Sequence, residues 1–117
     1  MHAERYKTLN KALDQILATL IAEYQPEKII LFGSMATGQV SEWSDLDLVI
    51  IKDTAKPFIE RSEEVALLCL APVSVHYLVY TPEEFARMIE QNNHFILNEI
   101  ISNGKVLYER QPTSIMA

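Results

Sequence analysis

The chain has 117 residues, of which 49% are apolar and 22% are charged, and this length and composition are typical of a single globular domain. Its formal net charge of −6 argues against bulk nucleic-acid binding, which needs a basic surface, and would suit a basic protein partner. The polar N-terminus lacks the features of a signal peptide, and no apolar run approaches the roughly 18 residues that a membrane helix needs, so we expect a cytoplasmic protein without membrane contact.

The first half of the chain is predicted to hold a long helix and two strands. Apolar residues recur at steps of three and four before Pro26, which indicates one helix with a single apolar stripe. The continuous apolar run before Gly33 indicates a strand that is buried on both faces. In chain order we expect a helix over 4–24, a strand over 28–32, a turn or short helix over 34–38, a loop over 39–43 and a strand over 45–52.

The second half continues this alternation of helices and strands. Thr81 and Glu84 have the spacing of a capping box, and Pro82 between them fits the first helical turn. Gly104 is expected to end the last helix in a left-handed conformation. In chain order we expect a helix over 57–70, a strand over 73–80, a helix from 82 to a break at 92–93, a helix from 95 to Gly104, a short edge strand over 106–108 and a loose tail over 111–117.

Strands that alternate with helices in this way are typical of mixed folds. We therefore predict an α+β fold of two layers, in which helices pack on one face of a small mixed sheet of three to four strands. The prediction places one domain over 1–110 and leaves the tail over 111–117 outside it.

Two carboxylates stand at the start of the second predicted strand. Because side chains alternate along a strand, Asp45 and Asp47 are expected to point the same way, and Leu46 to the opposite face. Such a pair is costly unless a cation or solvent compensates the charges, and it suits Mg²⁺, which takes further ligands from water and substrate phosphates. The small residues from Gly33 to Gly38 form a turn whose backbone can approach phosphates. Together these features indicate a nucleoside triphosphate site.

The third predicted strand also alternates. Ser74 and His76 share one face, whereas Val75 and Tyr77 share the other. If the apolar face packs on helices, His76 lies on the face that carries the two carboxylates.

The spacing of these residues resembles the signature of the nucleotidyltransferase superfamily that includes DNA polymerase beta, and most closely its small members, the minimal nucleotidyltransferases. The family signature is Gly-Ser, a short linker with a second glycine, and Ser-Asp-x-Asp followed by apolar residues. In this chain it reads Gly33-Ser34, Gly38 and Ser44-Asp45-Leu46-Asp47. The first helix, the segment over 78–85 and the closing 106–109 also match, so the resemblance covers nearly the whole chain and implies a nucleotidyltransferase-like fold.

This resemblance implies a reaction and a metal. The family moves a nucleoside monophosphate from a triphosphate to an acceptor hydroxyl, with release of pyrophosphate, and we expect AMP from ATP. Asp45 and Asp47 would act in catalysis as ligands of Mg²⁺, with Mn²⁺ as the alternative.

The resemblance also implies four nucleotide-binding residues. Gly33 would let the backbone approach the triphosphate, and Ser34 would donate its hydroxyl and backbone N–H to phosphate oxygens. Ser44 would orient the carboxylates or cap the loop. Gly38 would complete the turn.

The chain departs from the family pattern at two positions. The family usually carries a third carboxylate on the third strand, where this chain has His76, and often an arginine after Gly-Ser, where it has Met35. Three roles are open for His76: a general base that takes the acceptor's proton, a nitrogen ligand that favours Mn²⁺ or Zn²⁺, or the mark of a chain that binds nucleotide but catalyses poorly. A fourth alternative supplies the missing oxygen from Asp53, Glu63 or Glu64.

Two functions follow as alternatives. The first is a metal-dependent nucleotidyltransferase whose acceptor is a hydroxyl of a protein partner or a small molecule. Small family members often pair with a helical HEPN-domain protein as the antitoxin of a toxin–antitoxin system, and some transfer AMP to a tyrosine of that partner. The second is a catalytically weak or inactive nucleotide-binding subunit that acts by complex formation. The sequence leaves the nucleobase, the acceptor and homo-oligomer formation open.

Overall fold

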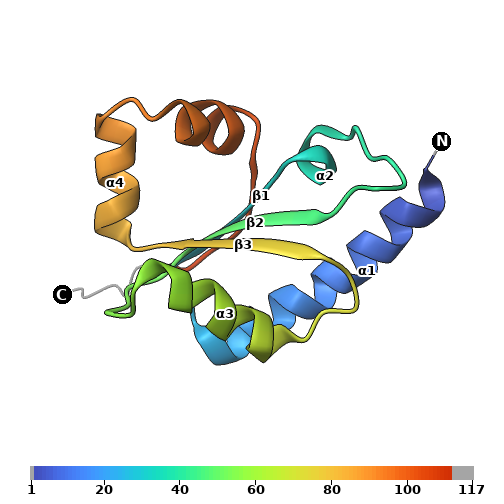
Figure 1. Ribbon diagram of the computed structural model, residues 1–117, viewed down its shortest axis with the longest axis horizontal. Helices are drawn as coiled ribbons and strands as arrows, with labels where there is room; N and C mark the ends of the chain where they lie inside the picture. Colours follow the sequence, from blue (N-terminus) through green and yellow to red (C-terminus); the bar gives the residue numbers. More distant parts are fainter. Residues whose placement is uncertain (1, 112–117) are drawn as a thin grey trace.

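The computed structural model of the chain describes residues 2–111. Four strands form one mixed sheet in the order β3-β2-β1-β4 (Figure 1). β1 (Lys28–Phe32) runs antiparallel to β2 (Leu46–Ile51) and to β4 (Lys105–Glu109), and β2 runs parallel to β3 (Val75–Tyr80). This mixed sheet confirms the predicted fold class. The tail predicted over 111–117 lies, apart from Gln111, outside the described residues.

The helical segments follow the predicted bounds, and two of them are π-helices. The first helical stretch ends at Tyr24, and the φ of 55° at the following Gln25 turns the chain just before Pro26. Apolar spacing alone does not distinguish α from π turns, which is why the sequence predicts only a helix in both places. Within residues 2–111, none of the helices combines the length and the apolar character needed to cross a membrane. In chain order the helical segments are α1 (Ala3–Thr19), η1 (Leu20–Tyr24), α2 (Ser34–Thr37), α3 (Phe58–Cys69), α4 (Pro82–Glu90) and η2 (Phe95–Ser102).

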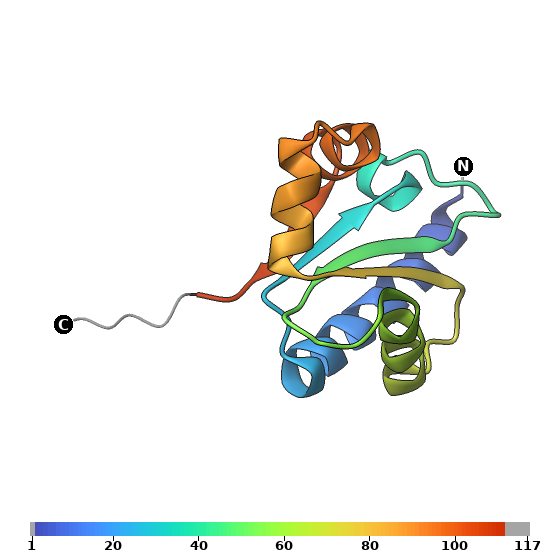
Figure 2. The same ribbon diagram turned by 60° about the vertical axis from the view of Figure 1, so that its left-hand side comes forward.

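Helices cover both faces of the sheet, and the expectation that they pack on one face is wrong (Figure 2). Every residue of β1 after Lys28 is apolar and buried, and alternate side chains of a strand point to opposite faces, so both faces need cover. Ile29 and Leu31 face α1, η1 and α3. Ile30 and Phe32 face α4 and η2, whose buried residues there are Phe85, Ile96 and Ile100.

Gly104 has a different role from the one predicted. Among the described glycines, a positive φ occurs at Gly33 and Gly38, so the left-handed conformation expected at Gly104 is not adopted. A Cβ at Gly104 would collide with the carbonyl oxygen of Ile100 and would lie 2.9 Å from Cγ2 of Ile30. Gly104 is therefore needed because η2 and β1 approach each other closely there.

A buried arginine ties α3, β3 and α4 together at the end of the sheet where β2 and β3 finish. Nη1 of Arg61 donates to Oε1 of Glu84 at 2.7 Å and to the carbonyl oxygen of Val79 at 3.1 Å. Glu84 also completes the predicted capping box with Thr81, which the structure confirms. The hydrogen bonds from Arg61 hold the pKa of the Glu84 carboxyl below its usual value.

Candidate active site

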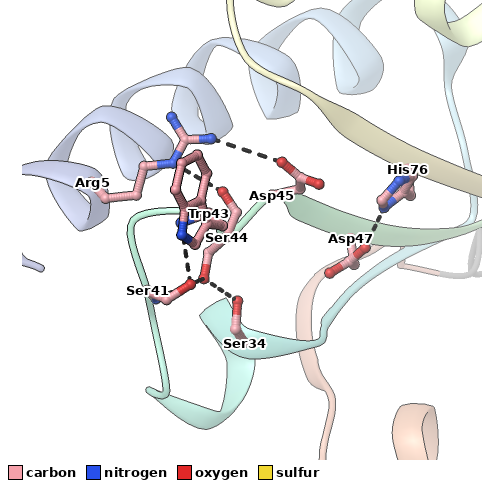
Figure 3. Close-up of polar contacts among 8 residues, drawn as sticks. All are labelled: Arg5, Ser34, Ser41, Trp43, Ser44, Asp45, Asp47 and His76. Carbon is pink, nitrogen blue, oxygen red and sulfur yellow. Dashed lines mark hydrogen bonds and ion pairs between the residues drawn. The ribbon is translucent and has the colours of Figure 1, made fainter.

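The parallel pairing of β2 with β3 brings Asp47 and His76 together, as the alternation of both strands predicts. The two residues are register partners, and Nδ1 of His76 lies 2.7 Å from Oδ1 of Asp47 (Figure 3). The side chain of His76 is 62% exposed and that of Asp47 is 21% exposed. The carboxylate therefore fixes the orientation of an imidazole that remains accessible from solvent.

The antiparallel register of β1 and β2 places Asp47 opposite Phe32, next to the bend at Gly33. Gly33 has a φ of 75° and a ψ of −156°, a conformation that is essentially restricted to glycine. A Cβ at this position would collide with Oδ2 of Asp47. The absence of a side chain at Gly33 thus makes room for the carboxylate, whose Oδ1 faces His76 and whose Oδ2 faces the bend.

We expect Gly33→Ala to displace the Asp47 carboxylate and to destabilise the fold by about 3 kcal/mol, since it adds a collision to a strained backbone. The matched control is Gly38→Ala. Gly38 also has a positive φ, of 84°, but a Cβ there would meet no atom within 4 Å, so only the left-handed penalty of about 1 kcal/mol is expected. Chemical denaturation measures both changes. The imidazole NMR signals of His76 should shift in Gly33→Ala alone, and unchanged signals would contradict the close packing of Gly33 and Asp47.

Three serines fasten the loop that follows α2. The hydroxyl of Ser44 is buried and accepts hydrogen bonds from Oγ of Ser34 at 2.9 Å and from the backbone N–H of Ser41 at 2.8 Å (Figure 3). Ser44 thus caps the loop, which is one of the two roles that the sequence suggests for it. The hydroxyl of Ser34 donates to Ser44 of this loop. To donate to a phosphate, as predicted, it would have to give up this hydrogen bond.

Asp45 lies one residue before β2 and has a different partner from Asp47. Nη2 of Arg5, in α1, lies 3.8 Å from Oδ1 of Asp45, and Nε of Arg5 donates to the carbonyl oxygen of Ser44 at 2.9 Å. Figure 3 shows the guanidinium between the start of β2 and the loop. Arg5 was not predicted as a site residue, because it lies 39 positions from Ser44 and shares no local sequence pattern with it.

The remaining predicted positions divide between the turn and the far end of the sheet. Gly38 ends α2 in a left-handed conformation, and Met35 is buried in the core beneath the turn. Asp53 follows the opposite end of β2 from Asp47, and Glu64 pairs with Lys56 at 3.1 Å. Within residues 2–111 no group of three or more His, Cys, Asp or Glu side chains forms a metal site. The alternative in which Asp53, Glu63 or Glu64 completes the carboxylate set is therefore wrong.

One hollow of the described surface lies away from these residues. It has a volume of about 690 Å³ and is lined by Lys28, Ile51, Phe85 and Arg110 among others. Lys28 and Ile51 pair at one end of β1 and β2, whereas Phe32 and Asp47 pair at the other. The hollow and the candidate site thus occupy opposite ends of the same two strands.

Comparison with known proteins assigns the chain to a family. Residues 14–113 match the family described as "Polymerase beta, Nucleotidyltransferase", and because the match spans most of the chain, the chain belongs to that family. This confirms the superfamily that the Gly-Ser and Asp-x-Asp spacing predicts.

Two curated relatives come from Methanocaldococcus jannaschii. The relative named "Putative protein adenylyltransferase MJ0604" is 31% identical over 100 residues, which cover 84% of this chain and 96% of the relative. The relative named "Putative protein adenylyltransferase MJ1305" is 29% identical over 112 residues, which cover 89% of this chain and 74% of the relative. A crystal structure described as "a putative nucleotidyltransferase from Sulfolobus solfataricus" has a TM-score of 0.57 and 15% identity, over 98% of this chain and 89% of the other, and shares the fold.

Proposed function

We propose that this chain is a metal-dependent nucleotidyltransferase that transfers AMP from ATP to a hydroxyl of a protein partner or a small molecule. The observation that carries the proposal is the position of the Asp47 carboxylate, between the bend at Gly33 and the imidazole of His76. The names of the two curated relatives support adenylyl transfer and a protein acceptor.

The residues at the site fit a divalent cation. Asp45 and Asp47 offer carboxylate oxygens, the ligands that Mg²⁺ and Mn²⁺ prefer, and both side chains are partly exposed. We propose that the carboxylates of these two residues would hold Mg²⁺ or Mn²⁺. When bound, the metal would neutralise charge on the phosphate oxygens during transfer. Gly33 keeps the Asp47 carboxylate beside the bend, and Ser34 with Ser44 holds the loop at the start of β2.

His76 is the proposed general base. Its Nδ1 is held by Oδ1 of Asp47, and the exposed ring can reach an acceptor hydroxyl that a partner presents. An imidazole that a carboxylate orients in this way is suited to take a proton from a hydroxyl. This assignment favours the first of the three roles left open by the sequence.

We expect His76→Ala to slow AMP transfer by about a hundredfold, the usual contribution of a positioned base, while the affinity for Mn²⁺ and for ATP stays the same. Single-turnover transfer and calorimetric titration measure the two quantities. Loss of Mn²⁺ affinity in this variant would show instead that His76 is a ligand.

We propose that the acceptor lies on a protein partner, with a HEPN-domain protein as the candidate and an antitoxin role for this chain in the cytoplasm. The acidic net charge of −6 favours a basic partner surface. A second function rests on the imidazole at position 76, where the family usually has a carboxylate. In that case the chain binds nucleotide and partner but transfers little or no AMP.

Incubation of the chain with labelled ATP, Mg²⁺ or Mn²⁺ and the protein encoded beside it tests the proposal. Metal-dependent transfer of label to that protein is the expected result. A stable complex with bound nucleotide and no label would favour the second function. Absence of nucleotide binding in the presence of metal and partner would rule out both.

A further inference from the structure

Arg5 is a cation of the candidate site to which the proposed reaction assigns no role. It lies in the first turns of α1, and its side chain is 27% exposed. Its two recorded contacts are unequal. The hydrogen bond from Nε to the Ser44 carbonyl, at 2.9 Å, has ordinary geometry, whereas Nη2 lies 3.8 Å from Oδ1 of Asp45, beyond hydrogen-bond reach (Figure 3).

The contact of Arg5 with Asp45 is weak enough for the guanidinium to leave it for another partner. A partly exposed ion pair without short, parallel N–H···O bonds contributes little to stability. The Asp45 side chain is itself 33% exposed. The bond to the Ser44 carbonyl would remain as an anchor when the pair separates. Ser44 is in turn held by Ser34 at the bend, so Arg5 stays fixed to the loop of the site.

A bound metal and nucleotide would change the charges around Arg5. A divalent cation on Asp45 competes with the guanidinium for the same carboxylate, and it brings the negative charge of a triphosphate to the bend. The planar guanidinium, which has five N–H donors, matches the oxygens of a phosphate group. The residue after the Gly-Ser pair offers no such contact, because Met35 is buried in the core.

We propose that Arg5 is a phosphate-binding residue that exchanges partners: it neutralises Asp45 in the free protein, and in the complex it keeps its bond to Ser44 and turns its Nη groups to the triphosphate. This inference rests on the proposed function and adds a residue from α1 to the site. It predicts opposite effects on two affinities. Removal of the guanidinium should strengthen the binding of metal in the absence of nucleotide and should weaken the binding of nucleotide.

The experiment measures two affinities in the full chain. In Arg5→Ala, Mn²⁺ alone should bind about threefold more tightly, because an exposed competing ion pair is lost. ATP with Mg²⁺ should bind about tenfold more weakly, because a hydrogen bond to a charged group is lost. Calorimetry measures the first. The fluorescence of Trp43, the single tryptophan of the chain and the neighbour of Ser44, measures the second.

Two further variants separate this role from a structural one. Lys11→Ala removes an exposed charge from the same helix and should leave both affinities unchanged. Arg5→Lys keeps the charge without the planar fork, and its ATP affinity should lie between those of the wild type and Arg5→Ala. If both affinities fall in Arg5→Ala, or neither changes, Arg5 does not exchange partners. If the wild type binds neither Mn²⁺ nor ATP, the proposed function fails and this inference fails with it.

Discussion

Asp47→Asn is expected to reduce metal-dependent AMP transfer about a thousandfold, the effect of losing about 4 kcal/mol of transition-state stabilisation. The substitution removes the charge of the carboxylate that lies against the bend at Gly33 and also holds the imidazole of His76. It keeps the size and shape of the side chain, so the fold should be retained. Transfer of label from ATP, measured at saturating metal, checks the result, and circular dichroism checks the fold.

The control for this loss is Asp53→Asn, which removes an exposed carboxylate that follows the other end of β2. Strand residues advance by roughly 3.3 Å each, so Asp53 is too far from the bend to share a ligand with Asp47. Its transfer rate should match that of the wild type. Equal losses in the two variants would indicate a general effect of acidic charge and would contradict the assigned role of Asp47.

Arg61→Ala is expected to lower the free energy of unfolding by about 3 kcal/mol, since it removes the hydrogen bonds of a buried guanidinium to a carboxylate and to two backbone carbonyls. Arg61 is buried, and its guanidinium donates to Glu84 and to the carbonyl oxygens of Lys56 and Val79. The helices α3 and α4 and the strand β3 would lose their common link. Unfolding in guanidinium chloride measures the change.

Arg110→Ala is the matched control, because the ion pair of Arg110 with Glu27 is exposed and 3.9 Å long. We expect a change below about 1 kcal/mol there.

The ion pair of Arg61 with Glu84 also predicts a pH dependence of the free energy of unfolding. Ionised Glu84 stabilises the fold above its ordinary pKa, and this contribution is lost in acid, as the pH falls through the lowered pKa of the folded state. In Arg61→Ala the free energy of unfolding should therefore fall less steeply as the pH is lowered. A guanidinium chloride midpoint of Arg61→Ala equal to that of Arg110→Ala would contradict the structural role of Arg61.

Local pattern was sufficient to place Asp47 and His76 on the same face of the sheet. Alternation along each strand assigns that face, whereas the parallel register that makes the two residues partners was not predicted and comes from the structure. The capping box at Thr81 and the bounds of the helices follow from equally local signals. These features depend on neighbours within a few residues, which is the range that a sequence pattern describes.

Features that depend on distant segments were predicted less well. The ion pair of Arg5 with Asp45 joins α1 to the start of β2, and no local pattern connects them. Gly104 was assigned a left-handed turn, whereas its role is to let η2 approach Ile30 of β1. The single helical layer was wrong although the burial of β1 on both faces was predicted, because buried strands do not indicate which helices cover which face.

The central claim is that the bend at Gly33 and the carboxylates of Asp45 and Asp47 hold a metal–triphosphate together. Paramagnetic broadening by Mn²⁺ in the presence of ATP, observed in the amide NMR spectrum, tests this claim most directly. We predict selective broadening at Gly33, Ser34, Asp45 and Asp47, with little effect at Phe85 in the hollow at the other end of the sheet. Broadening centred on that hollow, or none at any described residue, would contradict the claim.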